Sequence, residues 1–526
     1  MTASPSREYG ENPADWFLTA VERGNDDTRL DSRHADSASW TCGNVARPLI
    51  HGATYFRELR RAVERLSAGD LLLFTDWRGD PDERLDGPDS DVGRVFADAA
   101  ARGASVYGLL WRSHQFLKFG THQNRQLGKE IEAAGGHCLL DMRVPRFGAH
   151  HQKLVVLRHR DHPQDDVAFV GGIDLCHSRR DDARHLGDPQ ALAMAAAYGD
   201  RPPWHDVQLA VQGPAVGDVE TVFRERWEDV APLSRNPVPL VSSWLHGESM
   251  KPTPMPPQGS DPRQRGDLAI QLLRTYPRRR PGYPFARSGE RSVAQGYLKS
   301  LGKASSLVYV EDQYLWSREV ASIYAQALRR EPRLLMLFVI PGYPEEDGRL
   351  SAPPNLIGRQ VALEALRAAG GDRFAVYFIE NGAGTPVYVH AKVCVVDDRW
   401  VCIGSDNTNR RSWTHDTELS AAIVDESSSG WVRSLRLSLA AEHLGSDAFA
   451  SDLSDPTSFF EAFRASASAL EHWHRSDRTG PRPTGHLRPF VQEPLRRRTR
   501  LWAEPVYKVV FDPDGRPRKM RRAQEF

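Results

Sequence analysis

Two stretches of the sequence carry the same short pattern: GAHHQKLVVL at 148–157 and VYVHAKVCVVDD at 387–398. Each is an apolar, β-branched run with a histidine and a lysine two residues apart, His151 and Lys153 in the first and His390 and Lys392 in the second. Residues i and i+2 of a strand share a face, so each run predicts a strand that directs one imidazole and one ammonium group the same way. Two such strands placed face to face would form a pocket suited to attacking and holding a phosphate.

The likeness extends beyond these motifs, because His390 follows His151 by 239 positions and the segments around them repeat at that spacing. In each copy an apolar run follows a helical stretch and leads through helix, strand, helix and strand to the His/Lys strand and a further strand ending in glycine. The paired segments are 71–77 and 307–316, 92–103 and 319–330, 104–111 and 333–340, 125–136 and 359–371, 137–144 and 374–380, and 167–172 and 400–405. This alternation predicts an α/β fold of two tandem α/β/α sandwich halves, related by a pseudo-twofold axis and sharing a single active site.

The chain of 526 residues is longer than the roughly 250–300 at which a single core stops growing. We expect five segments: an N-terminal extension (1–44), a first half (45–247), a Pro- and Arg-rich linker (248–289), a second half (290–474) and a basic C-terminal tail (475–526). One short strand, DLAIQLLR, is expected to interrupt the linker. The tail is expected to be a solvated surface segment, with contact to anionic lipid head groups or substrate as the alternative.

Charge and cysteine content narrow the function classes. Lys+Arg and Asp+Glu both number 69, and this zero net charge does not suit a globally basic nucleic-acid-binding protein. Five scattered cysteines without a CxxC pair disfavour a disulfide framework or a zinc site and fit a reducing compartment. The sequence has neither a signal-peptide pattern nor an apolar run near the roughly 18 residues of a spanning helix. We therefore expect a cytoplasmic protein, at most peripheral to a membrane, with secretion as the alternative.

The second copy contains further groups that suit phosphate chemistry. Lys392 can neutralise a phosphate oxygen, and Asn407 follows the small pair Gly404-Ser405, whose glycine permits close backbone approach. Glu418 is a carboxylate that can hold an imidazole in one tautomer. Asp397 stands where the strand ends, so we predict that it shapes a turn.

The first copy has diverged at one position, because Arg158 stands where the second copy has Asp397. It keeps Gly171-Gly172-Ile173-Asp174 at the place of Gly404-Ser405-Asp406-Asn407, and Pro203-Trp204-His205-Asp206 follows. A catalytic aspartate would leave the first half inactive, whereas one that only shapes the hairpin could be replaced by Asp161, Asp165 or Asp166. We favour the second interpretation, because a residue five positions after Lys153 points to the opposite face of the strand.

Together the paired His-x-Lys strands and the segments GGIDL, PWHD, YVEDQY and GSDNTNRRSW resemble the phospholipase D superfamily, most closely its two-motif, phosphatidylcholine-type lipases. The resemblance covers about residues 45–470, and the second copy fits the family pattern HxKxxxxD(x)6GSxN at every fixed position. It implies two phospholipase D-like halves with His151 as nucleophile and His390 as general acid/base, although the residues alone do not break that symmetry. It further implies that Glu418 orients His151 and that Asp206 orients His390. The remaining predicted site residues, which would hold the phosphate or the substrate around it, are Lys153, Lys392, Asn407, Asp174 and Ser405.

The reaction implied is hydrolysis of the head-group phosphodiester of a glycerophospholipid to phosphatidic acid through a phosphohistidine. Water or a primary alcohol would be the acceptor, so transphosphatidylation is included. We expect no cofactor and no metal, because ammonium groups supply the positive charge and the neighbours His150 and His151 would face opposite ways. The expected partner is a phospholipid at a membrane surface, with no nucleic acid, and the chain is expected to be a monomer. Three alternatives stay open: a phosphatidyltransferase like cardiolipin or phosphatidylserine synthases, a family nuclease, and a decayed membrane-binding protein, for which Arg158 is the only evidence.

Overall fold

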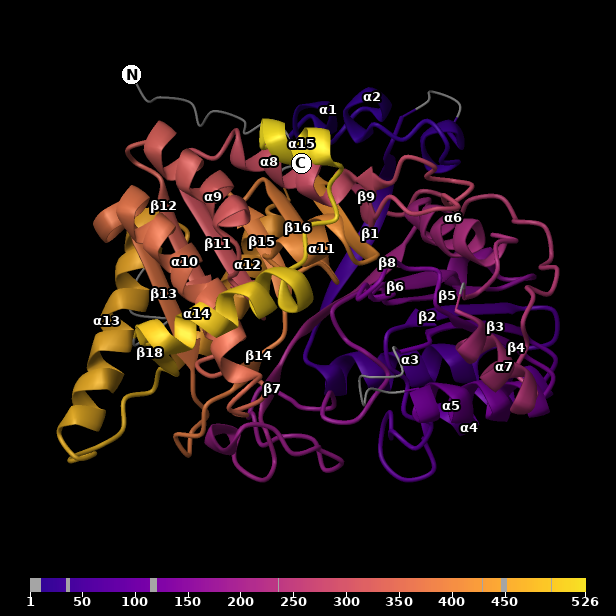
Figure 1. The fold of residues 1–526 in the computed structure, drawn as a ribbon, viewed down its shortest axis with the longest axis horizontal. Coiled ribbons are helices and arrows are strands. Elements are labelled where there is room, and N and C mark those ends of the chain that lie inside the picture. Colours follow the sequence, from indigo (N-terminus) through magenta and orange to yellow (C-terminus); the bar gives the residue numbers. More distant parts are fainter. Residues whose placement is uncertain are drawn as a thin grey trace, which may run out of the picture.

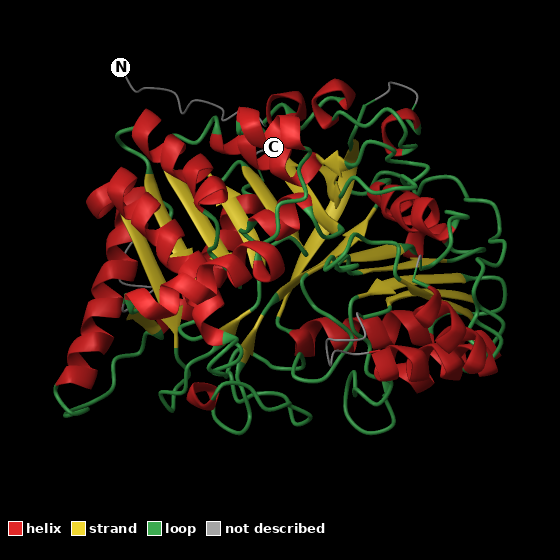
Figure 2. Ribbon diagram, viewed as in Figure 1, coloured by secondary structure: helices red, strands yellow, loops and turns green. Residues whose placement is uncertain are grey.

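A computed structural model describes residues 11–34, 38–113, 121–234, 236–427, 429–445, 452–492 and 494–526. Within these ranges sixteen strands form one continuous sheet, and helices cover it (Figures 1 and 2). Apolar side chains are buried on both faces of the sheet in each half. Two further strands, β7 (Trp204–His205) and β14 (Tyr388–Val389), pair with each other outside the sheet, one from each half of the chain.

The sheet has the same strand order on either side of its centre, as the repeat predicts. From the centre outward, the first half reads β1 (Thr41–Ile50), β8 (Val207–Gln212), β6 (Val167–Gly171), β5 (Leu154–Arg158), β2 (Leu71–Asp76), β3 (Ser105–Trp111) and β4 (His137–Asp141). The second half reads β9 (Leu268–Tyr276), β17 (Glu418–Asp425), β16 (Trp400–Gly404), β15 (Lys392–Val396), β11 (Leu307–Asp312), β12 (Leu335–Val339) and β13 (Phe374–Ile379), with β18 (Leu487–Pro489) at the edge and β10 (Glu290–Arg291) beside β9. The two halves meet where β1 and β9 pair antiparallel. The expected mixed α/β fold of two tandem halves is therefore present.

The helices follow from this strand order. Parallel neighbours need a crossover connection, and α4 and α5 supply it between β2, β3 and β4, as α9 and α10 do in the second half. The helices of the first half are α3 (Gly52–Glu64), α4 (Val92–Ala101), α5 (Thr121–Ala133), α6 (Ala215–Trp227) and α7 (Pro237–Leu245). Those of the second are α8 (Ser292–Leu301), α9 (Arg318–Arg330), α10 (Ala352–Gly370), α11 (Arg410–Thr414), α12 (Trp431–Leu444) and α13 (Pro456–Arg475), while the ends of the chain form α1 (Pro13–Trp16), α2 (Ala20–Arg23), α14 (Arg497–Val506) and α15 (Arg518–Ala523).

The two histidines lie just before their strands, which differs from the expected position within them. β5 begins at Leu154 and β15 begins at Lys392. The backbone N–H of His151 instead donates to the Thr417 carbonyl (3.0 Å), and that of His390 donates to the His205 carbonyl (2.7 Å). Each histidine backbone is thus hydrogen-bonded to the other half of the chain, because the motif leaves the central sheet where the halves meet.

The expected short strand of the linker is a central strand of the sheet. β9 is buried along its whole length and pairs with β17 on one side and β1 on the other. Its polar residues have buried partners: Gln271 hydrogen-bonds the backbone of Leu18 and Ser39, and Arg274 pairs with Glu225 and Glu290. The strand therefore joins the halves, and the segment boundaries given above stay a proposal.

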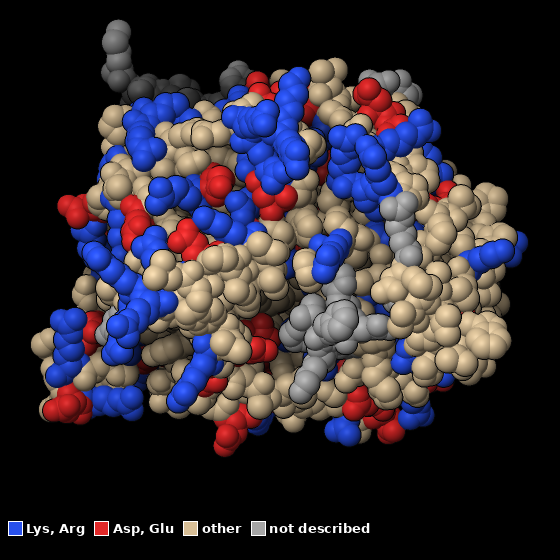
Figure 3. Space-filling model, viewed as in Figure 1, with Lys and Arg blue, Asp and Glu red and all other residues tan. Residues whose placement is uncertain are grey.

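The C-terminal segment is more than a solvated tail. β18 extends the sheet beside β13, and α14 packs against α10 across the front of Figure 1. The Tyr507 hydroxyl accepts from the Ser317 N–H (3.0 Å) and donates to the buried Asp512 (2.7 Å). The basic residues of α15 remain at the surface, at the top of Figure 3. Apolar residues spaced between the arginines, such as Tyr507, explain why this segment folds onto the second half.

None of the helices in the described ranges combines the length and the apolar character that a membrane span requires.

Candidate active site

The site contains two histidines, each hydrogen-bonded to a carboxylate from the other half of the chain. His151 Nδ1 lies 2.8 Å from Glu418 Oε2, at the start of β17. His390 Nδ1 lies 2.7 Å from Asp206 Oδ2, directly before β8. A carboxylate at Nδ1 fixes the tautomer and leaves Nε2 as the reactive atom. The arrangement places two oriented imidazoles at the junction of the halves, with the crosswise contacts that the resemblance implies.

The two lysines lie beneath the histidines and are almost fully buried. Lys153 Nζ is 3.3 Å from Asp174 Oδ1, and Lys392 Nζ is 3.3 Å from Gln313 Oε1 and 2.9 Å from His390 Nδ1. Each ammonium group also donates to the backbone carbonyl of the histidine two residues earlier. The lysines therefore add fixed positive charge next to both imidazoles.

Two predicted substrate-binding residues have other partners. Asp174 pairs with Lys153 and lies 3.8 Å from Arg179, and a carboxylate in that position repels a phosphate, so it holds the cations. Ser405 is buried, donates its hydroxyl to Glu418 (2.5 Å) and accepts from the Leu419 N–H (3.0 Å). Ser405 thus supports the carboxylate that orients His151 and does not line the cavity, whereas Asp174 does line it, so its contact with substrate stays a prediction.

Asn407, by contrast, faces the cavity above the histidines. It is buried, and its side-chain Oδ1 has no hydrogen-bond partner among the described residues. Its amide can therefore turn to meet a phosphate oxygen.

Gly172 leaves the space that the Asp206 carboxylate occupies. A Cβ atom on Gly172 would stand 2.5 Å from Asp206 Oδ1 and 3.3 Å from Lys392 Cδ. Any side chain there would displace the group that holds His390. The second glycine of GGID is thus needed for the close approach of Asp206, and of Lys392 from the other half, to this turn.

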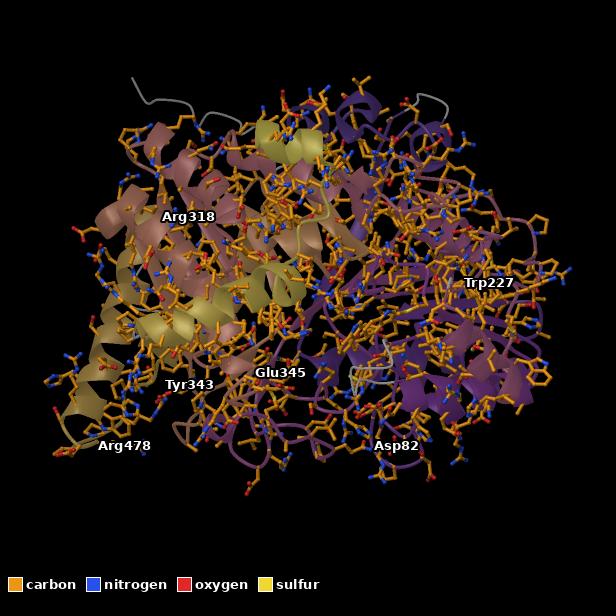
Figure 4. The ribbon with its side chains drawn as sticks, in the orientation of Figure 1. Asp82, Trp227, Arg318, Tyr343, Glu345 and Arg478 are labelled. Carbon is orange, nitrogen blue, oxygen red and sulfur yellow. The ribbon has the colours of Figure 1, made fainter. Side chains whose placement is uncertain are left out.

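The cavity has a volume of about 1000 Å³, and its walls come from both halves and from the C-terminal segment. Figure 4 labels two wall residues, Tyr343 and Glu345, below the centre of the view. Aromatic and apolar wall residues include Trp77, Trp111, Phe147, Tyr314, Val510 and Phe511, and the arginines are Arg112, Arg143, Arg146, Arg179, Arg278, Arg279, Arg280, Arg359 and Arg411. The run Arg278–Arg280 of the Pro- and Arg-rich linker therefore lies at the cavity.

The segment Tyr309–Tyr314 contributes to the site through Gln313, which lines the cavity and contacts Lys392. Glu311 faces away and accepts from His205 (2.7 Å) and His443 (2.8 Å). Sequence reasoning gave no role to Arg179, although it follows GGIDLCHS and its guanidinium stacks 3.9 Å from the Trp204 ring centroid. Trp204 in turn packs against the His390 ring.

Asp397 lies far from the chemistry and closes a hairpin, as its place at a strand end indicates. Its carboxylate accepts from the N–H groups of Ser305, Ser306 and Leu307, each at 2.8 Å. In the first half Arg158 pairs with Asp166 (2.8 Å), which also accepts from the His159 N–H (2.6 Å). Asp166 thus closes the first hairpin, and Arg158 leaves the groups around His151 unchanged.

Burial sets the protonation of the histidines. The pKa of His151 and that of His390 lie well below the ordinary value, because burial disfavours the imidazolium and because Lys153 and Lys392 stand beside them. Burial also raises the pKa of Glu418 to about 8 and lowers that of Lys392 to about 8. The pKa shifts of both histidines favour the neutral imidazole, which is the form that a nucleophile requires.

Fold and site together define a two-half α/β protein with one histidine pair at the junction of its halves. A family model described as PLDc, Phospholipase D, matches residues 123–323 and 378–493, more than half of the chain. The chain belongs to the phospholipase D family.

Individual relatives are distant. Phospholipase D alpha 1 of Cynara cardunculus is 24% identical over 490 residues, covering 70% of this chain and 60% of that protein. Phospholipase D alpha 4 of Arabidopsis thaliana is 26% identical over 501 residues, covering 76% and 64%. The chain thus spans less than two thirds of the length of these relatives. Among solved structures, phosphatidylserine synthase of Haemophilus influenzae Rd KW20 is 12% identical, with a TM-score of 0.49, covering 74% of this chain and 84% of that one.

Proposed function

We propose that this protein is a phosphodiesterase that cleaves the head-group phosphodiester of a glycerophospholipid. The observation that carries the proposal is the crosswise pairing of His151 with Glu418 and of His390 with Asp206 at the base of one cavity. A pair of oriented imidazoles supplies both a nucleophile and a proton donor, the two groups that a phosphodiester with a poor alkoxide leaving group requires.

In the first step Nε2 of His151 attacks phosphorus and forms an N–P bond, while the bond from phosphorus to the head-group oxygen breaks. The departing oxygen takes a proton from Nε2 of His390. In the second step His390 removes a proton from water, whose oxygen attacks phosphorus and releases His151 with phosphatidic acid. A primary alcohol in place of water would give transphosphatidylation through the same two groups.

Charge explains how one neutral imidazole becomes an acid. The phosphate diester brings a negative charge to a buried site, and this charge raises the pKa of His390 from its depressed value once substrate is bound. Lys153, Lys392 and Asn407 would then bind the non-bridging oxygens, where charge accumulates in the transition state.

The walls of the cavity favour a lipid over a nucleic acid. Phe147, Val510 and Tyr343 line the cavity and are partly exposed, so apolar surface continues from the site to solvent. Such a rim suits acyl chains, while the arginines suit the phosphate. The zero net charge of the chain gives no general attraction to a polynucleotide.

The test is to incubate the pure protein with vesicles of labelled phosphatidylcholine and separately with plasmid DNA, with and without a primary alcohol. We expect phosphatidic acid from the lipid, the phosphatidyl alcohol when alcohol is present, and intact DNA. His151→Ala should lose at least about 10³-fold in turnover, whereas His162→Ala, at an exposed loop position, should retain full activity. Cleavage of DNA alone would refute the lipid assignment, and near-normal activity of His151→Ala would refute the site.

A further inference from the structure

Behind the Asp206–His390 pair lies a second cluster of imidazoles that the proposed reaction does not use. Three histidine rings converge on Glu442 in α12: Nε2 of His51 at 2.8 Å, Nε2 of His185 at 3.0 Å and Nδ1 of His205 at 3.1 Å. The three histidines are buried, and the four ligand-type atoms all lie within 4.8 Å of one another. None of these residues lines the cavity.

We propose that His51, His185, His205 and Glu442 form a binding site for a divalent transition-metal ion, for which zinc is the best fit. Zinc prefers four tetrahedral ligands at about 2.0–2.2 Å, which places ligand atoms roughly 3.3 Å apart and the imidazole rings about 5 Å apart. The ring centroids are 5.0, 5.2 and 5.8 Å apart. The cluster therefore needs only small shifts to receive the ion.

Two of the rings have a hydrogen-bond partner on the side that faces away from Glu442. His205 Nε2 lies 2.7 Å from Glu311, and His185 Nδ1 lies 3.2 Å from the Trp204 carbonyl. The outer nitrogen of each ring is thus held, and the inner nitrogen, Nδ1 of His205 or Nε2 of His185, faces Glu442. A histidine that donates its outer nitrogen to a carboxylate or carbonyl is the usual arrangement around a bound metal.

Two buried carboxylates elsewhere in the molecule are paired with arginines. Asp141 pairs with Arg143 and Arg226, and Glu290 pairs with Arg23 and Arg274. Among the described residues, the ion-pair partners of Glu442 are histidines alone. A divalent cation would supply the positive charge that arginine supplies elsewhere.

The pseudo-twofold axis shows that the cluster is a feature of one side only. His205 stands directly before Asp206, and its equivalent in the second half is Thr417, directly before Glu418. The equivalent of His51, which donates its N–H to the Asp206 carbonyl, is Thr275, the strand partner of Glu418. The fold needs only small residues at these two positions in the second half, whereas the first half has two metal-ligand side chains. His51 also adopts a φ of 69°, in a region that few non-glycine residues occupy, so contacts with the surrounding structure must hold its backbone in this conformation.

The ion would position the catalytic pair and would not itself touch substrate. His51, His185 and His205 come from the first half and Glu442 from the second, so one ion would join the halves next to β7, whose pairing with β14 also joins them (Figure 1). The His205 carbonyl accepts from the His390 N–H, and Asp206 is the next residue. Four protein ligands would close the coordination sphere, as in structural zinc sites. The sequence predicts no metal, because its cysteines and the pair His150-His151 do not suit one, and the proposed ion joins residues that no local motif connects.

The experiment measures metal in the full-length protein, purified without a polyhistidine tag, by plasma mass spectrometry. We expect about one zinc per chain, and His185→Gln should retain less than about a fifth of it. His34→Gln is the matched control, because His34 contacts the carboxylates Asp218 and Asp261 without further imidazoles, and it should retain the full content.

A second measurement does not depend on a variant that folds. Removing metal from the wild-type protein with 1,10-phenanthroline should lower the melting temperature by about 5 °C or more, and one equivalent of zinc should restore it. Wild-type protein without bound metal, whose melting temperature responds to neither chelator nor zinc, would overturn the proposal. Equal loss of metal from His34→Gln would overturn it too. Neither readout depends on the proposed lipid chemistry.

Discussion

Gly172→Ala tests whether the position of Asp206 is needed for catalysis. The added Cβ would stand 2.5 Å from Asp206 Oδ1, where an ordinary contact needs at least 3.4 Å, so the carboxylate must move by about 0.9 Å. Asp206 is fully buried and packed beside Lys392, which leaves the carboxylate little room to move without pulling the His390 ring with it. A misplacement of about 1 Å at a catalytic group costs on the order of 10²-fold in rate. Overpacking of this kind costs roughly 1–3 kcal/mol in stability.

The assay is the initial rate of head-group release from phosphatidylcholine vesicles, measured well below the melting temperature of each variant. We expect a kcat about 10²-fold below wild type. Gly382→Ala is the control, because a Cβ at this exposed glycine meets nothing within 4 Å, and it should keep full activity. Activity of Gly172→Ala within about twofold of wild type, in a folded protein, would show that His390 does not depend on where Asp206 lies.

Two further predictions concern charge. Because burial lowers the pKa of Lys392 to about 8, its ammonium group is charged below that pH and neutral above it. We therefore expect kcat/KM to fall as the pH rises through about 8, and Lys392→Arg should move this fall to a higher pH. A profile that stays flat to about pH 9.5 would contradict the role of this lysine. Arg158→Asp introduces the aspartate of the family pattern but removes the guanidinium group that pairs with the buried carboxylates of Asp166 and Glu220. We expect the free energy of unfolding, measured with urea, to fall by about 3–5 kcal/mol, with no gain in activity. A more active variant would show that an aspartate at this position serves catalysis.

Much of the fold could be predicted because both halves repeat the same order of apolar runs. The strand at Leu71–Asp76 and its counterpart at Leu307–Asp312 stand out as short, fully buried segments, and each leads into an amphipathic helix. β9 was harder to place, because whether a strand lies in a linker or at the centre of a sheet depends on partners distant in sequence. Its polar residues Gln271 and Arg274 do not indicate a central strand by themselves, because the partners that satisfy them lie elsewhere in the chain.

The site could be predicted where the pattern is local and could not where it depends on packing. His151, His390 and their lysines are visible as pairs two residues apart, and their carboxylates came from the resemblance. Ser405 and Asp174 share motif positions with substrate-binding residues, but only the packing reveals that each holds a neighbouring side chain. The histidine cluster around Glu442 joins positions up to 391 residues apart, a separation at which no spacing rule applies.

The two copies have diverged at residues that act within one half, and not at the catalytic histidines. Arg158 and Asp397 each serve the hairpin of their own half, so one could change once Asp166 closed the first hairpin. The histidines have no such freedom, because each takes both its backbone acceptor and its carboxylate from the opposite half. A substitution of one of these carboxylates would therefore alter the reactive histidine of the opposite half. The copies can therefore differ where a residue acts within its own half, whereas the two catalytic histidines keep the same arrangement because each depends on a carboxylate of the opposite half.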